Sequence, residues 1–174
     1  MNDTAVATRA KPAAHIAKLY DNSVPALMKM LVEYATGRTQ FTFPSLRLAF
    51  LSGDWIPVLL PDQLKSLVPG IEVIGLGGAT EASIWSILYP IGAISPGWSS
   101  IPYGRPMLNQ RIYVLNECLE PCPVSVPGQL YIGGIGLAKG YWKDPEKTAS
   151  SFFHHPLTGE RLYRTGDLGR YLPD

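Results

Sequence analysis

The spacing of apolar residues predicts that helices and strands alternate in the first half of the chain. Apolar positions recur at helical intervals from Pro25 to Tyr34, and Gly37 follows as a helix terminator. Beyond this helix, short apolar runs bounded by Pro and Gly predict, in order, a strand over 46–52, a helix over 61–67, a strand over 72–76 and a helix over 80–88. Strand, helix, strand, tight turn and helix is the order typical of a parallel sheet.

The pattern changes after Pro90. Pro, Gly and Ser dominate as far as Arg105, and short strands then recur around one short helix. The strands are expected over 110–115, 129–132, 161–164 and 169–172, and the helix over 144–153. The predicted fold class is therefore α/β, with part of a parallel α/β sheet followed by an antiparallel unit that is barrel-like or sandwich-like. Of these two we expect a small distorted antiparallel β-barrel. We expect three segments: a poorly ordered leader over 1–21, a partial α/β unit over 22–95 and a β-rich unit over 96–174.

Composition narrows the classes of function. The 174 residues are 46% hydrophobic and 17% charged, which is typical of a globular chain. The net charge of +1 offers no basic surface for nucleic acid. No apolar run approaches the roughly 18 residues of a membrane span, and the N-terminus lacks an apolar signal core, so we expect a cytoplasmic protein with no membrane partner. Cys118 and Cys122 are too few for a disulfide scaffold or a zinc site.

Candidate chemistry begins at the glycine turn Gly77-Gly78-Ala79-Thr80-Glu81. Glycines let a backbone approach a ligand closely, and the amides of a helix N-terminus favour phosphate or carboxylate groups. Thr80 could then offer a hydroxyl to a phosphate, while Glu81 could hold Mg²⁺. The alternative is that Thr80 is a plain N-cap and Glu81 a plain first-turn carboxylate.

A second candidate is Thr165-Gly166-Asp167. A strand delivers the Asp167 carboxylate at a glycine turn, where its two oxygens could accept hydrogen bonds from the vicinal hydroxyls of a ribose. The alternative is a hairpin-turn Asp that bonds its own backbone. The glycines of the block 128–141 are interpreted as permitting tight turns and bulges, and His154 and His155 as solvated or loop residues.

Taken in order, the blocks 77–81, 128–141 and 163–168 resemble the motifs of adenylate-forming enzymes, and more narrowly of the amino-acid adenylation domains of nonribosomal peptide synthetases. The segments 22–27, 51–57 and 101–106 fit the same branch, so the resemblance runs from about Asn22 to Asp174. It implies a fragment of the large subdomain of such an enzyme.

The resemblance also implies roles for individual residues. Thr80 and Glu81 would be catalytic, Thr80 at the α-phosphate region and Glu81 as the Mg²⁺ ligand. Asp167 would hold the ribose. The loop lining adenine and the acyl group would be Gly77, Gly78 and Ala79, and the side-chain pocket would be lined by Asn22, Phe50, Ser52, Leu76, Ile84 and Trp85. Many relatives carry an adenine-stacking aromatic residue where this chain has Gly77, and Pro where it has Ala79.

The implied reaction activates an amino acid, or a related carboxylic acid, with ATP and loads it on the phosphopantetheine of a carrier protein. The implied partners are the remaining adenylation subdomain and that carrier. Two features of the family, its phosphate loop and the lysine of its C-terminal subdomain, are not found among these residues. We therefore expect the isolated chain to be inactive. Two alternatives stay open: a non-catalytic remnant that binds nucleotide or docks on a synthetase, and part of an acyl-CoA ligase-like enzyme. The acid is not identified.

Overall fold

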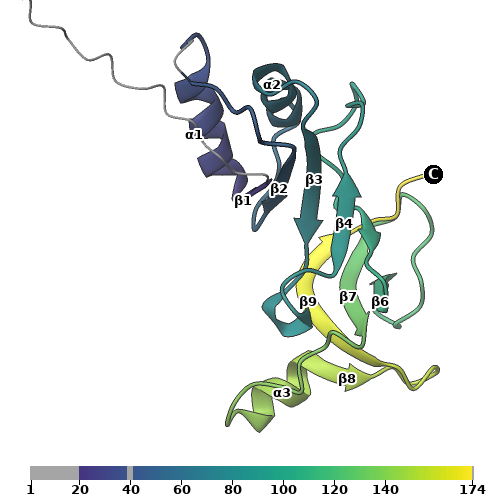
Figure 1. The fold of residues 1–174 in the computed structure, drawn as a ribbon. Coiled ribbons are helices and arrows are strands. Elements are labelled where there is room, and N and C mark those ends of the chain that lie inside the picture. The colour runs from purple at the N-terminus through teal and green to yellow at the C-terminus, as the bar shows by residue number, and fades with distance from the viewer. Residues whose placement is uncertain (1–19, 39–40, 174) are drawn as a thin grey trace, which may run out of the picture.

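The computed structural model describes residues 20–38 and 41–173, so the expected leader lies almost entirely outside the described residues. Two sheets and three helices make up the described part (Figure 1). In chain order the elements are β1 (Tyr20–Ser23), α1 (Pro25–Ala35), β2 (Leu48–Ser52), α2 (Leu60–Leu67), β3 (Glu72–Gly77), a 3-10 turn (Thr80–Ala82), β4 (Ile87–Pro90), β5 (Arg105–Pro106), β6 (Gln110–Leu115), β7 (Gly128–Gly134), α3 (Pro145–Ser151), β8 (Phe152–His154) and β9 (Arg161–Gly169). No helix in the described ranges has the length and hydrophobicity needed to cross a membrane.

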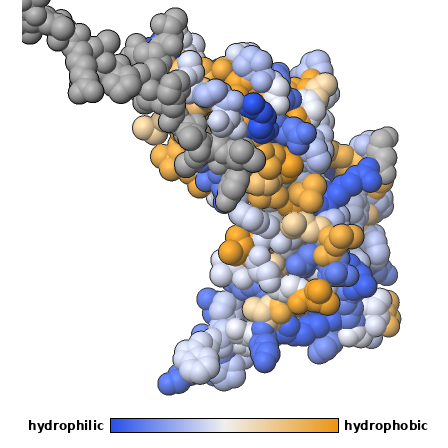
Figure 2. All heavy atoms as spheres, viewed as in Figure 1, coloured by the Kyte–Doolittle hydropathy of each residue, from blue (hydrophilic) through white to orange (hydrophobic). Residues whose placement is uncertain are grey.

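The first sheet has the strand order β1-β2-β3-β4-β5. Strands β1, β2 and β3 run parallel, whereas β4 and β5 join antiparallel, which confirms the expected parallel α/β portion. Helices α1 and α2 pack on one face of this sheet, and Figure 2 shows hydrophobic residues gathered over this part of the molecule. The core between helices and sheet includes Met28, Val32, Ala49, Leu51, Leu60, Leu64 and Val73.

The second sheet is antiparallel, with the order β6-β7-β9-β8. Strands β6 and β8 are its two edges and do not pair with each other, so the expected barrel is not confirmed among the described residues. Leu115, Tyr131 and Leu162 pack in one cluster of this sheet. Ile132, Phe152 and Tyr163 pack in another, together with Ala82 of the 3-10 turn. The turn that follows β3 therefore shares a core with the second sheet.

The predicted helix over 80–88 is wrong. Only Thr80–Ala82 forms a 3-10 turn, because Ser83 and Ile84 adopt φ of 62° and 70°, which an α-helix cannot accommodate. The apolar run that follows instead forms β4, which pairs antiparallel with β3. A short apolar run is compatible with a strand or a helix, and here the pairing with β3 makes it a strand.

Two further expectations change in the second half. The strand expected over 161–164 continues to Gly169 as β9, and the separate strand expected over 169–172 is wrong, because residues 170–172 form no strand. The helix expected over 144–153 ends at Ser151, because Phe152 begins β8 and pairs with Tyr163.

Candidate functional site

The glycine turn is shaped by Gly78, whose φ is +148°. A Cβ atom at Gly78 would lie 2.6 Å from both the Ile84 carbonyl oxygen and the Ser86 amide nitrogen, so no other residue fits without moving backbone. Residues 84–86 therefore pack directly against Gly78. Thr80 is exposed on this turn and Glu81 is half-buried. Since the turn holds only three residues, it provides no α-helix N-terminus for an anion, in contrast to the sequence prediction.

The segment that follows β7 forms hydrogen bonds with this turn. The Ala138 amide donates to the Glu81 carbonyl oxygen at 2.7 Å, and the Ser83 hydroxyl donates to the Gly136 carbonyl oxygen at 2.8 Å. The Arg161 guanidinium in turn donates to the carbonyl oxygen of Ala138 at 2.8 Å. The glycine-rich segment after β7 is therefore a support for the turn, which agrees with its interpretation as structural.

The Glu81 carboxylate accepts a hydrogen bond from the Tyr141 hydroxyl at 2.6 Å. Burial raises the pKa of Glu81, but hydrogen bonding from Tyr141, its own backbone and Tyr163, with the charge of Lys147, outweighs it and lowers the pKa below the usual range. Tyr163 belongs to the same cluster: burial, and then its hydrogen bonding with Tyr141 and Glu81, raises the pKa of its phenol. The arrangement keeps Glu81 ionised and fixed in position.

The donor set at Glu81 fits Mg²⁺ that arrives with a phosphate ligand. Among residues 20–38 and 41–173, no group of three or more His, Cys, Asp or Glu side chains could hold a metal ion. Mg²⁺ needs no such group, because it is commonly bound through one or two carboxylates, waters and substrate phosphates. An ionised carboxylate has about four lone-pair sites, so the bond from Tyr141 leaves capacity for a cation.

Asp167 lies in a bulge of β9 rather than in a hairpin turn. The register between β7 and β9 shifts between Gln129 and Tyr131, and Gly166 adopts φ of +87°. The Thr165 hydroxyl fixes the bulge, because it donates to the Leu130 carbonyl oxygen at 3.0 Å and accepts from the Asp167 amide at 3.0 Å. The Asp167 carboxylate is exposed and accepts no hydrogen bond from the described residues, so both oxygens face solvent or ligand.

Strand register brings four of the six expected pocket residues onto one face. Asn22 is paired with Phe50, and Ser52 with Leu76, across neighbouring parallel strands. Paired residues, and residues two apart in one strand, point to the same side of a sheet. This is the face opposite Ala49 and Leu51, which α1 and α2 cover.

The remaining two pocket candidates lie in the segment behind the turn. Ile84 is 64% exposed and belongs to no hydrophobic cluster of the described chain. Trp85 is half-buried, with its Cα atom behind Gly78. The structure therefore groups the four strand residues but does not pack Ile84 with them.

Sequence reasoning missed three tyrosines at this site. Tyr141 and Tyr163 stand inside the quoted blocks, but nothing in the sequence shows that they meet Glu81. Tyr103 lies beside Gly77: a Cβ atom at Gly77 would lie 1.9 Å from the Cε2 atom of its ring. The only signal for Tyr103 is its place in the segment 101–106.

The site therefore combines a glycine turn at the end of a mixed sheet with two phenols and an open carboxylate supplied by β9 and the segment that follows β7. A family model described as AMP-binding enzyme matches residues 20–142, so the chain belongs to the AMP-binding enzyme family.

Its relatives include nonribosomal peptide synthetases. The chain is 52% identical over 154 residues to bacitracin synthase 1 of Bacillus licheniformis, with 85% of this chain and 3% of the synthase covered. It is 50% identical over 153 residues to pyochelin synthetase PchF of Pseudomonas aeruginosa, with 88% of this chain and 8% of that protein covered. The chain thus spans a small part of the length of these relatives.

A solved structure of a nonribosomal peptide synthetase has a similar fold. The nonribosomal peptide synthetase FmoA3 superposes with a TM-score of 0.86 at 48% identity, covering 89% of this chain and 17% of that one. FmoA3 has also been solved with AMPPNP and with α-methyl-L-serine-AMP. Together the comparisons confirm the α/β fold class and the resemblance to peptide-synthetase adenylation domains.

Proposed function

We propose that this chain supplies the Mg²⁺, ribose and side-chain-pocket walls of an adenylation domain that activates an amino acid, or a related carboxylic acid, for nonribosomal peptide synthesis. In this reaction a carboxylate oxygen of the acid attacks the α-phosphorus of ATP. The bond between the α-phosphorus and the bridging oxygen breaks, and pyrophosphate leaves with that electron pair. The thiol sulfur of the phosphopantetheine on a carrier protein then attacks the acyl carbon of the acyl-adenylate. A thioester forms, the bond between the acyl carbon and the phosphate oxygen breaks, AMP leaves with that electron pair, and the thiol proton is released.

The observation that carries the proposal is the Glu81 carboxylate, which stays ionised and fixed on the glycine turn by Tyr141. Mg²⁺ bound there would neutralise phosphate charge. Thr80, next to it and exposed, is available to donate to the α-phosphate region. Asp167 is available to accept from the two ribose hydroxyls.

The glycine turn would line the adenine and the acyl group. Gly78 and Ala79 have little or no side chain and are partly exposed, so their backbone can approach a ligand closely, whereas Gly77 is buried at the end of β3. Asn22, Phe50, Ser52 and Leu76 share the sheet face that α1 and α2 leave uncovered, which suits a pocket wall. Ile84 and Trp85 would complete it from the segment behind the turn.

Peptide synthetases among the relatives favour an amino-acid adenylation domain over an acyl-CoA ligase-like enzyme. FmoA3 with AMPPNP or α-methyl-L-serine-AMP, and an artificially fused adenylation–PCP protein from Klebsiella oxytoca, support a nucleotide, an amino acid and a carrier protein as ligands and partner.

The division into units over 22–95 and 96–174 remains a prediction. The relatives do not favour the other alternative, a non-catalytic remnant that at most binds nucleotide or docks on a synthetase.

Calorimetric titration of the full chain with AMP tests the proposal. We expect binding that weakens when Asp167→Asn removes one charged acceptor of the ribose hydroxyls, by about 10-fold or more. Asp62→Asn is the matched control, since Asp62 is equally exposed but lies on α2. Amino-acid-dependent ATP–pyrophosphate exchange then tests the chemical step: we expect no exchange above background from this chain alone, and exchange would show that the phosphate loop and the lysine are dispensable. A folded chain that does not bind AMP, or that binds AMP equally well with Asp167→Asn, would contradict the assignment.

A further inference from the structure

Gly77 is a glycine because of a neighbouring ring rather than because of its own backbone. Its φ lies outside the positive range that favours glycine, unlike that of Gly78. A Cβ atom at Gly77 would lie 1.9 Å from Cε2 of Tyr103 and 2.6 Å from both Cδ2 and Cζ. The Tyr103 ring therefore occupies the space that a side chain at the end of β3 would fill.

The fold holds Tyr103 in this place through the residue that follows it. Gly104 adopts φ of +112°, and a Cβ atom there would lie 2.2 Å from the Leu88 carbonyl oxygen. The segment is thus pressed directly against β4. Arg105 then pairs with Leu88 while Gly77 pairs with Ile87, so the register of three strands fixes the ring beside the glycine turn.

Tyr103 interacts with both the glycine turn and the open carboxylate of Asp167. Burial raises the pKa of the Tyr103 phenol; the Gly78 amide opposes this effect and the negative charge of Asp167 adds to it. Tyr103 is therefore an electrostatic neighbour of both residues. The residue is nevertheless 47% exposed, so a substantial part of Tyr103 is accessible to a ligand.

We propose that Tyr103 is the residue on which the base of the bound nucleotide stacks. The inference rests on the proposed function, in which Asp167 holds the ribose. Base and ribose are joined directly, so a ribose at Asp167 places the base within reach of a ring that neighbours Asp167. Every nucleobase offers a flat π-face to an aromatic side chain. A ring already held against the backbone loses little freedom when the base arrives.

Two ligands and two variants test this role in the full chain. AMP carries a base and ribose 5-phosphate does not, and both carry the hydroxyls and the phosphate. Tyr103→Leu keeps apolar volume without a ring, and we expect it to weaken AMP binding by about 5- to 100-fold. Ribose 5-phosphate, measured by competition or direct titration, should bind wild type and Tyr103→Leu alike. Tyr103→Phe keeps the ring and should bind AMP within about twofold of wild type.

The outcomes separate this inference from the proposed function. Equal AMP affinity in wild type and Tyr103→Leu overturns the stacking role while leaving the nucleotide site in place. Equal losses for AMP and ribose 5-phosphate also overturn it, because a merely structural residue would affect both. A folded wild-type chain that binds neither ligand overturns the proposed function and the stacking role together.

A third variant tests the stacking role if Tyr103→Leu does not fold. Gly77→Ala leaves Tyr103 intact but places a methyl group where its ring lies, so the ring must move. We expect AMP binding to weaken and ribose 5-phosphate binding to persist. Unchanged AMP affinity in folded Gly77→Ala would contradict the assignment, since the ring would then be dispensable at that position.

Discussion

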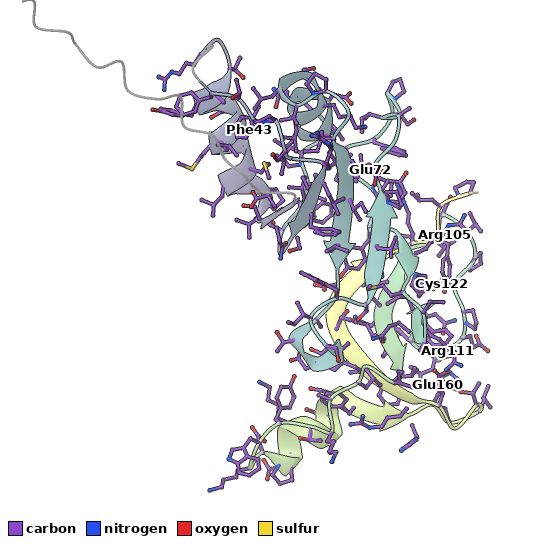
Figure 3. The ribbon with its side chains drawn as sticks, viewed as in Figure 1. Phe43, Glu72, Arg105, Arg111, Cys122 and Glu160 are labelled. Carbon is purple, nitrogen blue, oxygen red and sulfur yellow. The ribbon has the colours of Figure 1, made fainter. Side chains whose placement is uncertain are left out.

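Two tyrosine–glutamate pairs in this molecule have the same geometry and different surroundings. Tyr141 donates to Glu81 at 2.6 Å at the glycine turn, and Tyr113 donates to Glu160 at 2.6 Å at the edge of the second sheet. Glu160 also accepts from the Arg111 guanidinium at 2.9 Å, and Figure 3 shows the two side chains close together. The negative charge of Glu160 is thus already matched by a cation.

Glu81 has no such partner among the described residues. No Lys or Arg of the described chain forms an ion pair with it, and Lys147 acts at longer range, with its Nζ atom 4.2 Å from the centre of the Tyr141 ring. Two phenols therefore fix the Glu81 carboxylate without neutralising it. A short hydrogen bond alone does not distinguish a structural carboxylate from one that can bind a cation. The two carboxylates differ because Glu160 is paired with Arg111, whereas the charge of Glu81 is not matched by an ion pair.

The largest effect is expected when the charge itself is removed. Glu81→Gln should reduce the Mg²⁺-dependent part of ATP binding by at least about 100-fold, since even outer-shell partners of metal ligands contribute 10- to 100-fold. Glu160→Gln is the matched control and should leave Mg²⁺-dependent ATP binding unchanged. Titration of ATP with and without Mg²⁺ measures both variants. Similar losses in the two would remove the distinction between the pairs.

Displacing the turn without touching either pair should have the next largest effect. Gly78→Ala forces a methyl group onto the backbone of Ile84 and Ser86 at an unfavourable φ, and we expect a loss of about 2–3 kcal/mol in the free energy of unfolding. Gly92→Ala meets nothing within 4 Å and serves as the control. Urea denaturation compares the variants. A Gly78→Ala chain as stable as wild type would show that the turn is loosely held.

Removing the tyrosine hydroxyl of each pair should show which of the two hydrogen bonds matters for ATP binding. Tyr141→Phe and Tyr113→Phe each delete one hydrogen bond to a carboxylate, so each should lower the free energy of unfolding by about 1–3 kcal/mol. Only Tyr141→Phe should also weaken Mg²⁺-dependent ATP binding, by about 10-fold. An equal effect of both variants on ATP binding would argue against a positioning role for Tyr141.

The smallest effect concerns alkaline pH. Burial, the hydrogen bond to Glu160 and the charge of Glu160 raise the pKa of Tyr113 from 10.0 to about 12. Because the folded pKa is above the unfolded one, this contribution to stability is complete below pH 10 and is lost as the pH rises toward 12. Urea denaturation between these pH values should show a shallower decline for Tyr113→Phe than for wild type. Identical slopes would mean that Tyr113 is not the titrating group.

Local signals predicted much of the fold. Pro25 begins α1, and the Pro and Gly boundaries placed α2, β2 and β3 to within about two residues. They failed at 80–88, because the chain reverses there through two non-glycine residues with positive φ, Ser83 and Ile84, which no local rule indicates. The strand that follows owes its form to pairing with β3, which is a long-range effect.

The site divides in the same way. The glycine turn, Glu81 and Asp167 could be proposed from their motifs, and Asp167 was expected in a turn but lies in a bulge. The contacts that give these residues their environment join distant positions: Tyr141 and Glu81 are 60 residues apart. Tyr103 meets Gly77 only because two strand registers align. Such meetings are products of tertiary packing and leave no periodic trace in the sequence.

The hydrogen bonds from the segment after β7 to the turn after β3 have a consequence for recombination between related chains. Any crossover between residues 83 and 135 would take Glu81 from one parent and its supporting carbonyl, amide and phenol groups from the other. Hybrids joined in that interval would inherit a turn and a support that had never been matched to each other. Junctions before residue 77 or after residue 163 would transfer the turn and its support together, and so should yield folded chimeras more often.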